Sequence, residues 1–206
     1  MRLFIGIPLA AEVIDELSAI VARHRRREDG LRWAAPETRH ITLQFLGDTS
    51  PEQYKCIAAR LGELRSPPVP VRLGDLGFFD RTGVFFAGVQ VTPQLLALHQ
   101  SVIAATSRCG FVPESRLFHP HITLARAKGK SSDQGSATPA TRPEGTRRSL
   151  GTPAGVRDQS GLRGLKGKVQ LQRRFSCFNA AEFNLYESFL GPGGSRYEIR
   201  ERFLLN

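Results

Sequence analysis

The tetrapeptide HITL occurs twice in this chain of 206 residues, at residues 40–43 and at residues 121–124. Each copy predicts a short β-strand, because Ile, Thr and Leu favour a pleated, half-buried surface. Side chains alternate between the two faces of a strand, so His and Thr share one face while Ile and Leu share the other. A single copy would be read more simply as a packed histidine without catalytic duty. Two copies predict one site that combines two imidazoles and two hydroxyls.

The surroundings of the two copies indicate an internal duplication. Residues 2–46 predict a strand, a helix and a motif strand, and residues 84–126 predict the same order. A duplicated half placed around a pseudo-twofold axis would bring both motif strands to equivalent sides of a shared groove. We therefore expect residues far apart in the sequence to meet in one site.

Apolar spacing and turn residues predict the remaining elements. Helices are expected at residues 10–27, 51–64 and 93–109, and strands at 71–79 and 84–91, joined by a hairpin turn. Two further strands are expected at residues 178–189 and 197–205, with a turn at residues 191–194.

Composition and cysteine pattern indicate the cellular compartment of the protein. No apolar run reaches the length of a membrane span, and acidic Glu12, Asp15 and Glu16 follow the apolar start at once, so we expect neither a membrane anchor nor a cleaved leader. The three cysteines are odd in number, scattered and outside any Cys-x-x-Cys pair. They favour free thiols in a reducing compartment over a zinc site, and hence a cytoplasmic protein.

The net charge of +10 is concentrated in one region. Residues 126–174 hold twelve Lys or Arg and three Asp or Glu, a balance of +9, so the rest of the chain is close to neutral. Within this region residues 129–164 are rich in Gly, Ser, Thr and Pro and nearly lack large apolar side chains. Such a composition predicts a disordered basic insertion. It is either a tolerated surface loop or a basic tether for RNA.

Most of the chain resembles a known family, the two-histidine (2H) phosphoesterase superfamily, and within it the LigT-like RNA 2′,3′-cyclic phosphodiesterases of bacteria and archaea. Paired His-x-Thr motifs mark the superfamily, and the flanking residues point to the subfamily. The low-complexity insertion departs from the family pattern. The resemblance is carried by RLFIGIP at residues 2–8, HITLQFLG at 40–47, HPHITLAR at 119–126, LYES at 185–188 and GGSRY at 193–197.

The resemblance implies an α+β fold, in which residues 1–206 form a single bilobal domain with two antiparallel sheets, outer helices and a central cleft. It implies hydrolysis of an RNA 2′,3′-cyclic phosphate to a 2′-phosphate, with no metal and no cofactor. We expect a monomer whose partner is RNA, or a nucleotide, with a 2′,3′-cyclic phosphate end. By resemblance, His40 is the general acid toward the 3′ oxygen and His121 the general base, although the nearly symmetric sequence does not set this polarity.

The chemistry needs these residue types. Opening a cyclic phosphodiester removes a proton from water and gives one to the departing ribose oxygen, and imidazoles with a pKa of about 6.5 can do both. The hydroxyls of Thr42 and Thr123 can donate to the non-bridging oxygens as charge builds. Phe45 resembles the family residue that stacks on the base, but its odd offset from His40 requires a bulge near Gly47; core packing is the alternative. Arg126 either holds a phosphate or is an ordinary surface residue.

Three other readings remain open. The same residues could run in reverse as a 2′-5′ RNA ligase, or the fold could serve as an RNA-binding module without turnover. The string His119-Pro120-His121 could suggest a metal site, because alternation puts both imidazoles on one face, but no carboxylate or cysteine stands near it.

Overall fold

The computed structural model describes residues 1–128, 160–166, 175–191 and 194–206. Its helices and strands follow the expected order, with boundaries shifted by a few residues. The elements are β1 (Arg2–Pro8), α1 (Ala11–His24), β2 (Leu31–Trp33), η1 (Pro36–Thr38), β3 (His40–Asp48), α2 (Pro51–Gly62), β4 (Val69–Phe79), η2 (Asp80–Thr82), β5 (Val84–Val89), α3 (Pro93–Ser107), β6 (His121–Ala127), α4 (Ser160–Lys166), β7 (Cys177–Ala180), β8 (Glu182–Gly191) and β9 (Gly194–Leu204).

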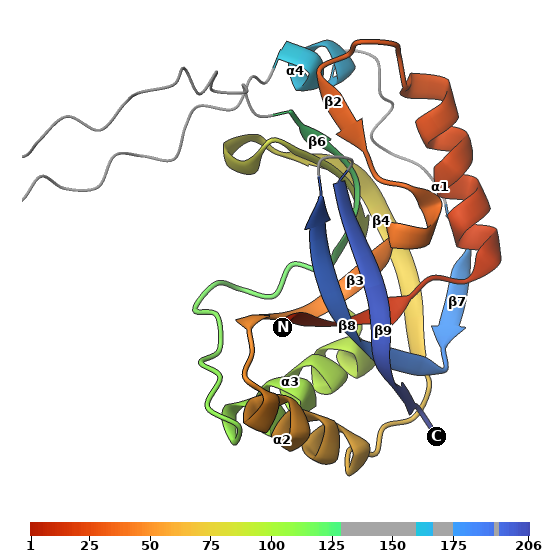
Figure 1. Cartoon of the computed structure of the whole chain (residues 1–206). Helices are drawn as coiled ribbons and strands as arrows, with labels where there is room; N and C mark the ends of the chain where they lie inside the picture. The colour runs from red at the N-terminus through yellow and green to blue at the C-terminus, as the bar shows by residue number, and fades with distance from the viewer. Residues whose placement is uncertain (129–159, 167–174, 192–193) are drawn as a thin grey trace, which may run out of the picture.

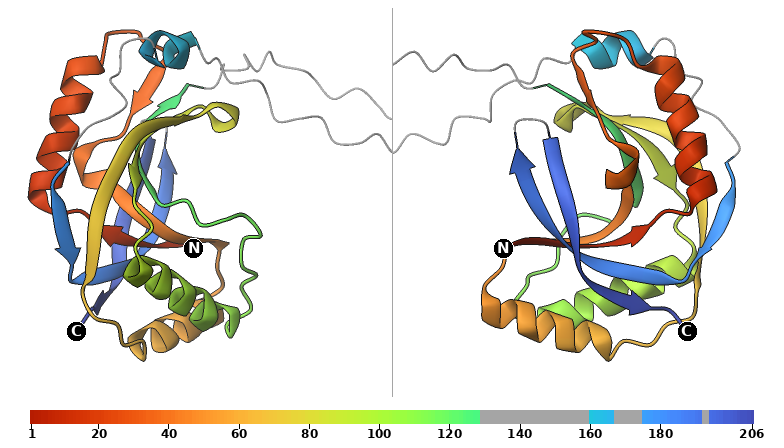
Figure 2. Two further views of the ribbon diagram at one scale, coloured as in Figure 1. Left: turned by 180° about the vertical axis from the view of Figure 1, so that it is seen from behind. Right: turned by 45° about the vertical axis from the view of Figure 1, so that its right-hand side comes forward.

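The described strands form two antiparallel sheets (Figures 1 and 2). Sheet A has the order β3-β1-β8-β9, and sheet B has the order β2-β6-β5-β4-β7. The motif strand β3 pairs with β1, and the motif strand β6 pairs with β5. The units β1-α1-β3 and β5-α3-β6 therefore repeat the order strand, helix, motif strand, and the expected α+β fold with two antiparallel sheets is confirmed.

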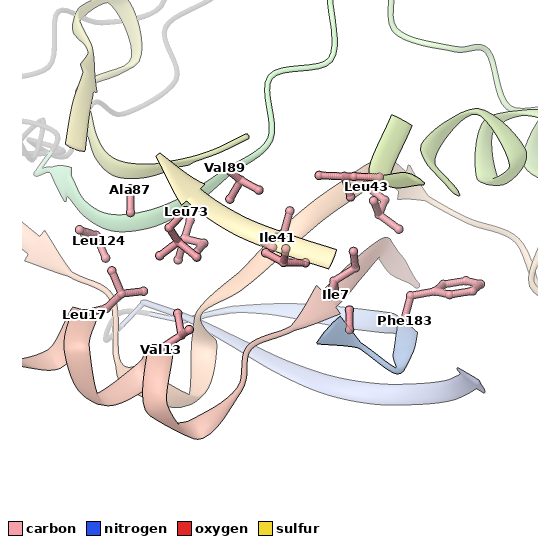
Figure 3. Packing of buried hydrophobic residues seen from close by; sticks show 14 of the residues in the cluster. Ile7, Val13, Leu17, Ile41, Leu43, Leu73, Ala87, Val89, Leu124 and Phe183 are labelled. Atoms are coloured by element: carbon pink, nitrogen blue, oxygen red, sulfur yellow. The ribbon is translucent and has the colours of Figure 1, made fainter. Parts of the chain in front are cut away.

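One hydrophobic core continues from one sheet to the other. Ile41 follows His40 in β3 and Leu124 lies in β6, so the apolar faces of both motif strands are buried in it. Figure 3 shows Leu17 of α1 directed toward Leu124 and Ala87, which places α1 against sheet B. Helices α2 and α3 lie together at the opposite end of the molecule (Figure 1). The core thus fixes one face of each motif strand and leaves the histidine face for other contacts.

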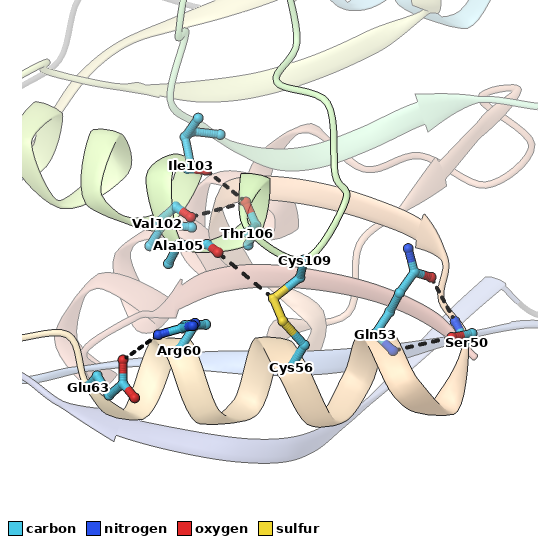
Figure 4. Close-up of a disulfide and its surroundings, with 10 residues drawn as sticks. All are labelled: Ser50, Gln53, Cys56, Arg60, Glu63, Val102, Ile103, Ala105, Thr106 and Cys109. Carbon is cyan, nitrogen blue, oxygen red and sulfur yellow. Dashed lines mark hydrogen bonds and ion pairs between the residues drawn. A yellow bond between two sulfur atoms is a disulfide. The ribbon is translucent and has the colours of Figure 1, made fainter.

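The prediction of three free thiols is wrong. Cys56 of α2 and Cys109, just after α3, form a disulfide with a Cα–Cα distance of 5.8 Å (Figure 4), and Cys177 is the free cysteine among the described residues. The two bonded residues are 53 positions apart, and only the packing of α2 beside α3 brings them together. The cysteine argument for a reducing compartment therefore fails.

The C-terminal end of the expected insertion is also different. Residues 160–164 belong to α4, where Leu162 is only 2% exposed and joins the hydrophobic core. Leu162 and Leu165 stand three positions apart, and this helical spacing was hidden among glycines. The rest of the expected insertion, residues 129–159, lies outside the described residues.

One expected strand is divided, and an additional strand precedes the first motif strand. The expected strand at residues 178–189 is split after Ala180 into β7 of sheet B and β8 of sheet A. Strand β2 ends at Trp33 and pairs with β6 of sheet B, while η1 separates it from β3 of sheet A. The chain changes sheets at both places, and single-sequence alternation does not reveal such a change.

Candidate active site

A β-bulge in β3 decides which side chains accompany His40. Thr42 pairs with Gly6 of β1 and Gln44 pairs with Ile5, so Leu43 is an extra residue in the ladder. Leu43 and Gln44 are both buried as a result, and the alternation restarts one position late. The bulge returns Phe45 to the face of His40 and Thr42. The sequence predicted a bulge near Gly47, and a second register shift does leave Leu46 as an extra residue there. The bulge at Leu43, which the sequence did not predict, is the one that brings Phe45 to this face.

The same irregularity recurs in β6. Thr123 pairs with Phe86 of β5 and Ala125 pairs with Phe85, so Leu124 is the extra residue. Leu124 and Ala125 are both buried, and Arg126 is exposed. Arg126 thus stands relative to His121 as Phe45 stands relative to His40. Both copies of the motif therefore contain the same bulge. The side chain that follows it is the phenyl ring of Phe45 in one copy and the guanidinium of Arg126 in the other.

The structure brings the ring of Phe45 to an aromatic cluster around His40. Phe45 is 59% exposed, which excludes the core-packing alternative. Its ring centroid lies 6.0 Å from that of Phe4, and the Phe4 ring lies 4.6 Å from the His40 imidazole. The outer face of Phe45 is therefore available to a planar ligand beside His40.

The sequence reasoning assigned no role to the other rings around His40. Tyr197 meets the imidazole edge to face with centroids 5.2 Å apart, and Tyr186 lies 5.9 Å away and stacks on Phe4. Both tyrosines belong to strings that carried the family resemblance, LYES and GGSRY. Those strings were a signal for the site, but β8 and β9 reach it only through sheet pairing.

Rings also enclose His121. Phe79 of β4 lies 4.9 Å from its imidazole and Phe86 of β5 lies 5.5 Å away, both edge to face. His119 is 6.4 Å from His121 between ring centroids. The rings cover part of each imidazole, and both histidines stay partly exposed.

Hydrogen bonds to carbonyl groups fix which nitrogen carries the proton in each histidine. Nδ1 of His40 lies 2.8 Å from the carbonyl oxygen of Thr38, and Nδ1 of His121 lies 2.9 Å from that of His119. A carbonyl oxygen can only accept, so Nδ1 must donate in both cases. In the neutral form Nε2 then carries the lone pair, and Nε2 of His40 accepts a bond from the Thr42 hydroxyl at 3.1 Å.

A buried arginine anchors the segment that holds His40. The guanidinium of Arg39, only 5% exposed, donates to the carbonyl oxygen of Ile14, the hydroxyl of Ser18 and the carbonyl oxygen of Ala34. It ties the turn before β3 to α1. The Thr38 carbonyl that sets the tautomer of His40 is thereby fixed in place, a role that the sequence alone did not suggest.

The two histidines lie close enough to influence each other electrostatically. Burial lowers the pKa of His40 from 6.5 to about 4, the bond to Thr38 opposes this, and the charges of His121 and Arg126 lower it further. Burial also lowers the pKa of His121, with further lowering by His119 and Arg126. Arg126 therefore lies within electrostatic reach of both imidazoles, and the two motif strands β3 and β6 are in contact. Thr42 and Thr123 stand beside the two histidines on the same two strands.

This geometry agrees with the comparisons to known proteins. The model of the 2′-5′ RNA ligase superfamily matches residues 8–139, which is more than half of the chain. The chain belongs to this superfamily. Two relatives named RNA 2′,3′-cyclic phosphodiesterase are similar to this chain in sequence. The one from Escherichia coli (strain K12) is 36% identical over 126 residues, and the one from Thermotoga maritima is 34% identical over 133 residues. The alignments cover 61% and 62% of this chain and 71% of each relative.

The similarity to solved structures covers nearly the whole chain. The crystal structure of E. coli LigT complexed with 3′-AMP is similar with a TM-score of 0.72 and 28% identity, covering 99% of this chain and 97% of that one. The resemblance that the sequence motifs indicated is thereby confirmed.

Within residues 1–128, 160–166, 175–191 and 194–206, no three His, Cys, Asp or Glu side chains gather as metal ligands would. His119 and His121 thus lack a third ligand there. No helix in the same ranges has the length and apolar character to cross a bilayer.

Proposed function

We propose that this chain is an RNA 2′,3′-cyclic phosphodiesterase, which hydrolyses a terminal 2′,3′-cyclic phosphate to a 2′-phosphate. One observation carries the proposal. Two histidines, on two strands with the same bulge, present Nε2 within electrostatic reach of each other and of Arg126. The relatives named above have this activity in their names, and they share most of their length with this chain.

His121 serves as the general base. Its Nδ1 is held as a donor by the carbonyl of His119, so the lone pair of Nε2 can take a proton from water. The water oxygen forms a new bond to phosphorus as this proton leaves. General base catalysis of this kind contributes about 10²–10⁴-fold in rate.

His40 serves as the general acid on the opposite side of phosphorus. As the bond between phosphorus and the 3′ oxygen breaks, protonated Nε2 of His40 gives its proton to that oxygen. The products are a 2′-phosphate and a 3′-hydroxyl, and one proton has moved from His40 to His121. Exchange with solvent restores the starting state. Thr42 and Thr123 donate to the non-bridging oxygens, so the step requires no cation.

The lowered pKa values suit a site whose histidines take up a proton when the substrate phosphate binds. Without ligand, burial favours neutral imidazoles in both copies. A phosphate anion between them raises both pKa values, because an opposite charge stabilises the protonated form. Binding of the cyclic phosphate thus promotes the protonation that His40 needs.

Phe45 and Arg126 supply different contacts from equivalent positions. The exposed ring of Phe45 can stack on the base of the terminal nucleotide, a contact worth about 1–3 kcal/mol. The guanidinium of Arg126 can pair with phosphate oxygens beside both histidines. The difference between the copies would then set the direction in which the nucleotide lies.

The test is a product analysis. The protein is incubated in chelator with an oligonucleotide that ends in a 2′,3′-cyclic phosphate, and phosphorus NMR identifies the product. We expect a 2′-phosphate, and a loss of at least about 10²-fold in rate for His40→Ala and for His121→Ala. A 3′-phosphate product, or activity that survives both substitutions, would refute the mechanism.

The family name supports a second candidate, ligation of RNA ends through a 2′-5′ linkage by the same residues in reverse. An assay with RNA halves that carry a 2′,3′-cyclic phosphate and a 5′-hydroxyl separates the two reactions. A non-catalytic RNA-binding role predicts instead salt-sensitive affinity, weaker after deletion of residues 129–159, and no turnover.

The setting of the reaction is also part of the proposal. We place the protein in the cytoplasm as a monomer, with RNA ends as its partner. Disulfides are rare in the cytosol, so the Cys56–Cys109 bond argues against this placement. Thiol counting on protein isolated under alkylating conditions, and light scattering for the mass, test both statements.

A further inference from the structure

Arg32 lies directly across from Arg126 in sheet B. Strand β2 pairs with β6 so that Leu31 faces Ala127, Arg32 faces Arg126 and Trp33 faces Ala125. Residues directly opposite in an antiparallel pair project to the same face. Leu31 is buried and Trp33 packs against the core, whereas Arg32 is exposed on the other face together with Arg126.

That face is the face of the candidate active site. The bulge at Leu124 places Arg126 on the same face of β6 as His121, and the charge of Arg126 lowers the pKa of both His121 and His40. Arg32 is one strand farther out, and it also approaches sheet A. A Cβ atom added at Gly194, in the β8–β9 hairpin, would lie 3.7 Å from Cδ of Arg32. Arg32 therefore stands between the two sheets, next to the site.

The charge of Arg32 has no carboxylate partner among the described residues. Within the part of the chain that the structure describes, Arg32 makes no ion pair with a carboxylate. Its exposed guanidinium can therefore pair with an anion of the substrate.

We propose that Arg32 binds the phosphate on the 5′ side of the terminal nucleotide, the next phosphate along the RNA strand from the cyclic one. The inference rests on the proposed function. Arg32 and Arg126 stand on adjacent strands, which are about 4.8 Å apart. The guanidinium of Arg126 can thus face the cyclic phosphate while that of Arg32 faces the neighbouring phosphate. The chain then prefers a phosphorylated RNA end over a bare nucleoside 2′,3′-cyclic phosphate.

Two substrates that differ by a single phosphate test the proposal. They are adenosine 2′,3′-cyclic phosphate and its 5′-phosphorylated form, and the measured quantity is the ratio of their kcat/KM values. For the wild-type chain we expect a ratio of about ten in favour of the 5′-phosphorylated form, as for one charge-assisted contact. Arg32→Gln brings the ratio close to one, Arg32→Lys retains most of the preference, and added salt weakens it in the wild type.

Arg108→Gln is the matched control, because Arg108 is an exposed arginine at the end of α3. It keeps the wild-type ratio. A purely structural role for Arg32 predicts a lower melting temperature in Arg32→Gln, whereas a role in binding predicts an unchanged one. A wild-type ratio of one, or an unchanged ratio in Arg32→Gln, would overturn this inference and leave the proposed function standing. Failure of the wild type to hydrolyse either substrate would remove both.

Discussion

At the residue scale, the proposed chemistry depends on two imidazoles whose neutral form is favoured by burial. In each of them Nδ1 donates to a backbone carbonyl, that of Thr38 or that of His119. Aromatic rings pack against each imidazole and cover part of it. Enclosure disfavours the charged form of both, and the nearby charge of Arg126 adds to the effect.

These pKa shifts predict an acid-shifted pH profile. The reaction needs one proton shared by the histidine pair, and in the free enzyme both pKa values lie below 6.5, that of His40 at about 4. As the pH falls from neutral, kcat/KM should therefore rise, and it should fall again once both imidazoles are protonated. The profile of kcat should lie at higher pH, because bound phosphate raises both values. Initial rates between about pH 4 and about pH 8 decide this. A kcat/KM maximum at or above neutral pH would contradict it, provided circular dichroism shows folded protein throughout.

Phe45→Ala should affect binding without affecting stability. The ring is 59% exposed, so its removal costs the core little, while a lost base stack of about 1–3 kcal/mol raises KM roughly tenfold. Leu117→Ala, at a loop side chain that is 95% exposed, is the control and should leave KM unchanged. The measurement is KM for a cyclic-phosphate nucleotide with a thermal melt of each variant. An unaltered KM in Phe45→Ala would remove the stacking role.

At the element scale, the site depends on how closely the motif strand β3 lies against β1. Gly6 is opposite Thr42 in that ladder. A Cβ atom at position 6 would stand 2.9 Å from the carbonyl oxygen of Ile41 and 3.2 Å from Cδ2 of His40. Glycine is therefore required at position 6 of β1, where the His40 imidazole packs against that strand.

Gly6→Ala should lower both stability and rate. Overpacking against a backbone carbonyl costs about 1–3 kcal/mol, and a displaced His40 should reduce kcat at least tenfold. Gly62→Ala, at the end of α2 where an added Cβ meets no atom within 4 Å, is the control and should be neutral or slightly stabilising. Denaturant unfolding and steady-state rates of both variants provide the comparison. Equal behaviour of the two variants would show that the approach of β1 to His40 does not matter.

Local pattern predicted most of the helices and strands and the repeated motif, but not α4 or the split between β7 and β8. Alternation placed His40 and Thr42 on one face. The bulges at Leu43 and Leu124 were not readable, because they are set by pairing with β1 and β5. The pairing of Arg32 with Arg126 across β2 and β6 and the bond between Cys56 and Cys109 could not be predicted either, since both depend on which elements become neighbours.

At the scale of the whole molecule, two sheets with a common core hold the halves of the site, and the disulfide ties α2 to the end of α3. Helix α2 follows β3 directly, and Cys109 begins the loop that leads to β6. The bond thus links the chain segments next to both motif strands.

Reduction of this disulfide should lower stability more than activity. The bond closes a loop between residues 53 positions apart, for which loop entropy predicts about 4 kcal/mol of stabilisation. Thermal melts with and without reductant measure the loss, with Cys177→Ser as the background so that the free thiol cannot exchange. The reduced protein should retain most of its rate at 25 °C. An unchanged melting temperature would mean that the bond contributes nothing to the fold.

The central claim is that His40 and His121 act on one phosphate, and a crystal structure with a bound nucleoside 2′-phosphate tests it most directly. The account predicts that Nε2 of both histidines lies at about 2.7–3.2 Å from oxygens of the same phosphate group. A phosphate that contacts only one imidazole, or that binds elsewhere on the molecule, would contradict it.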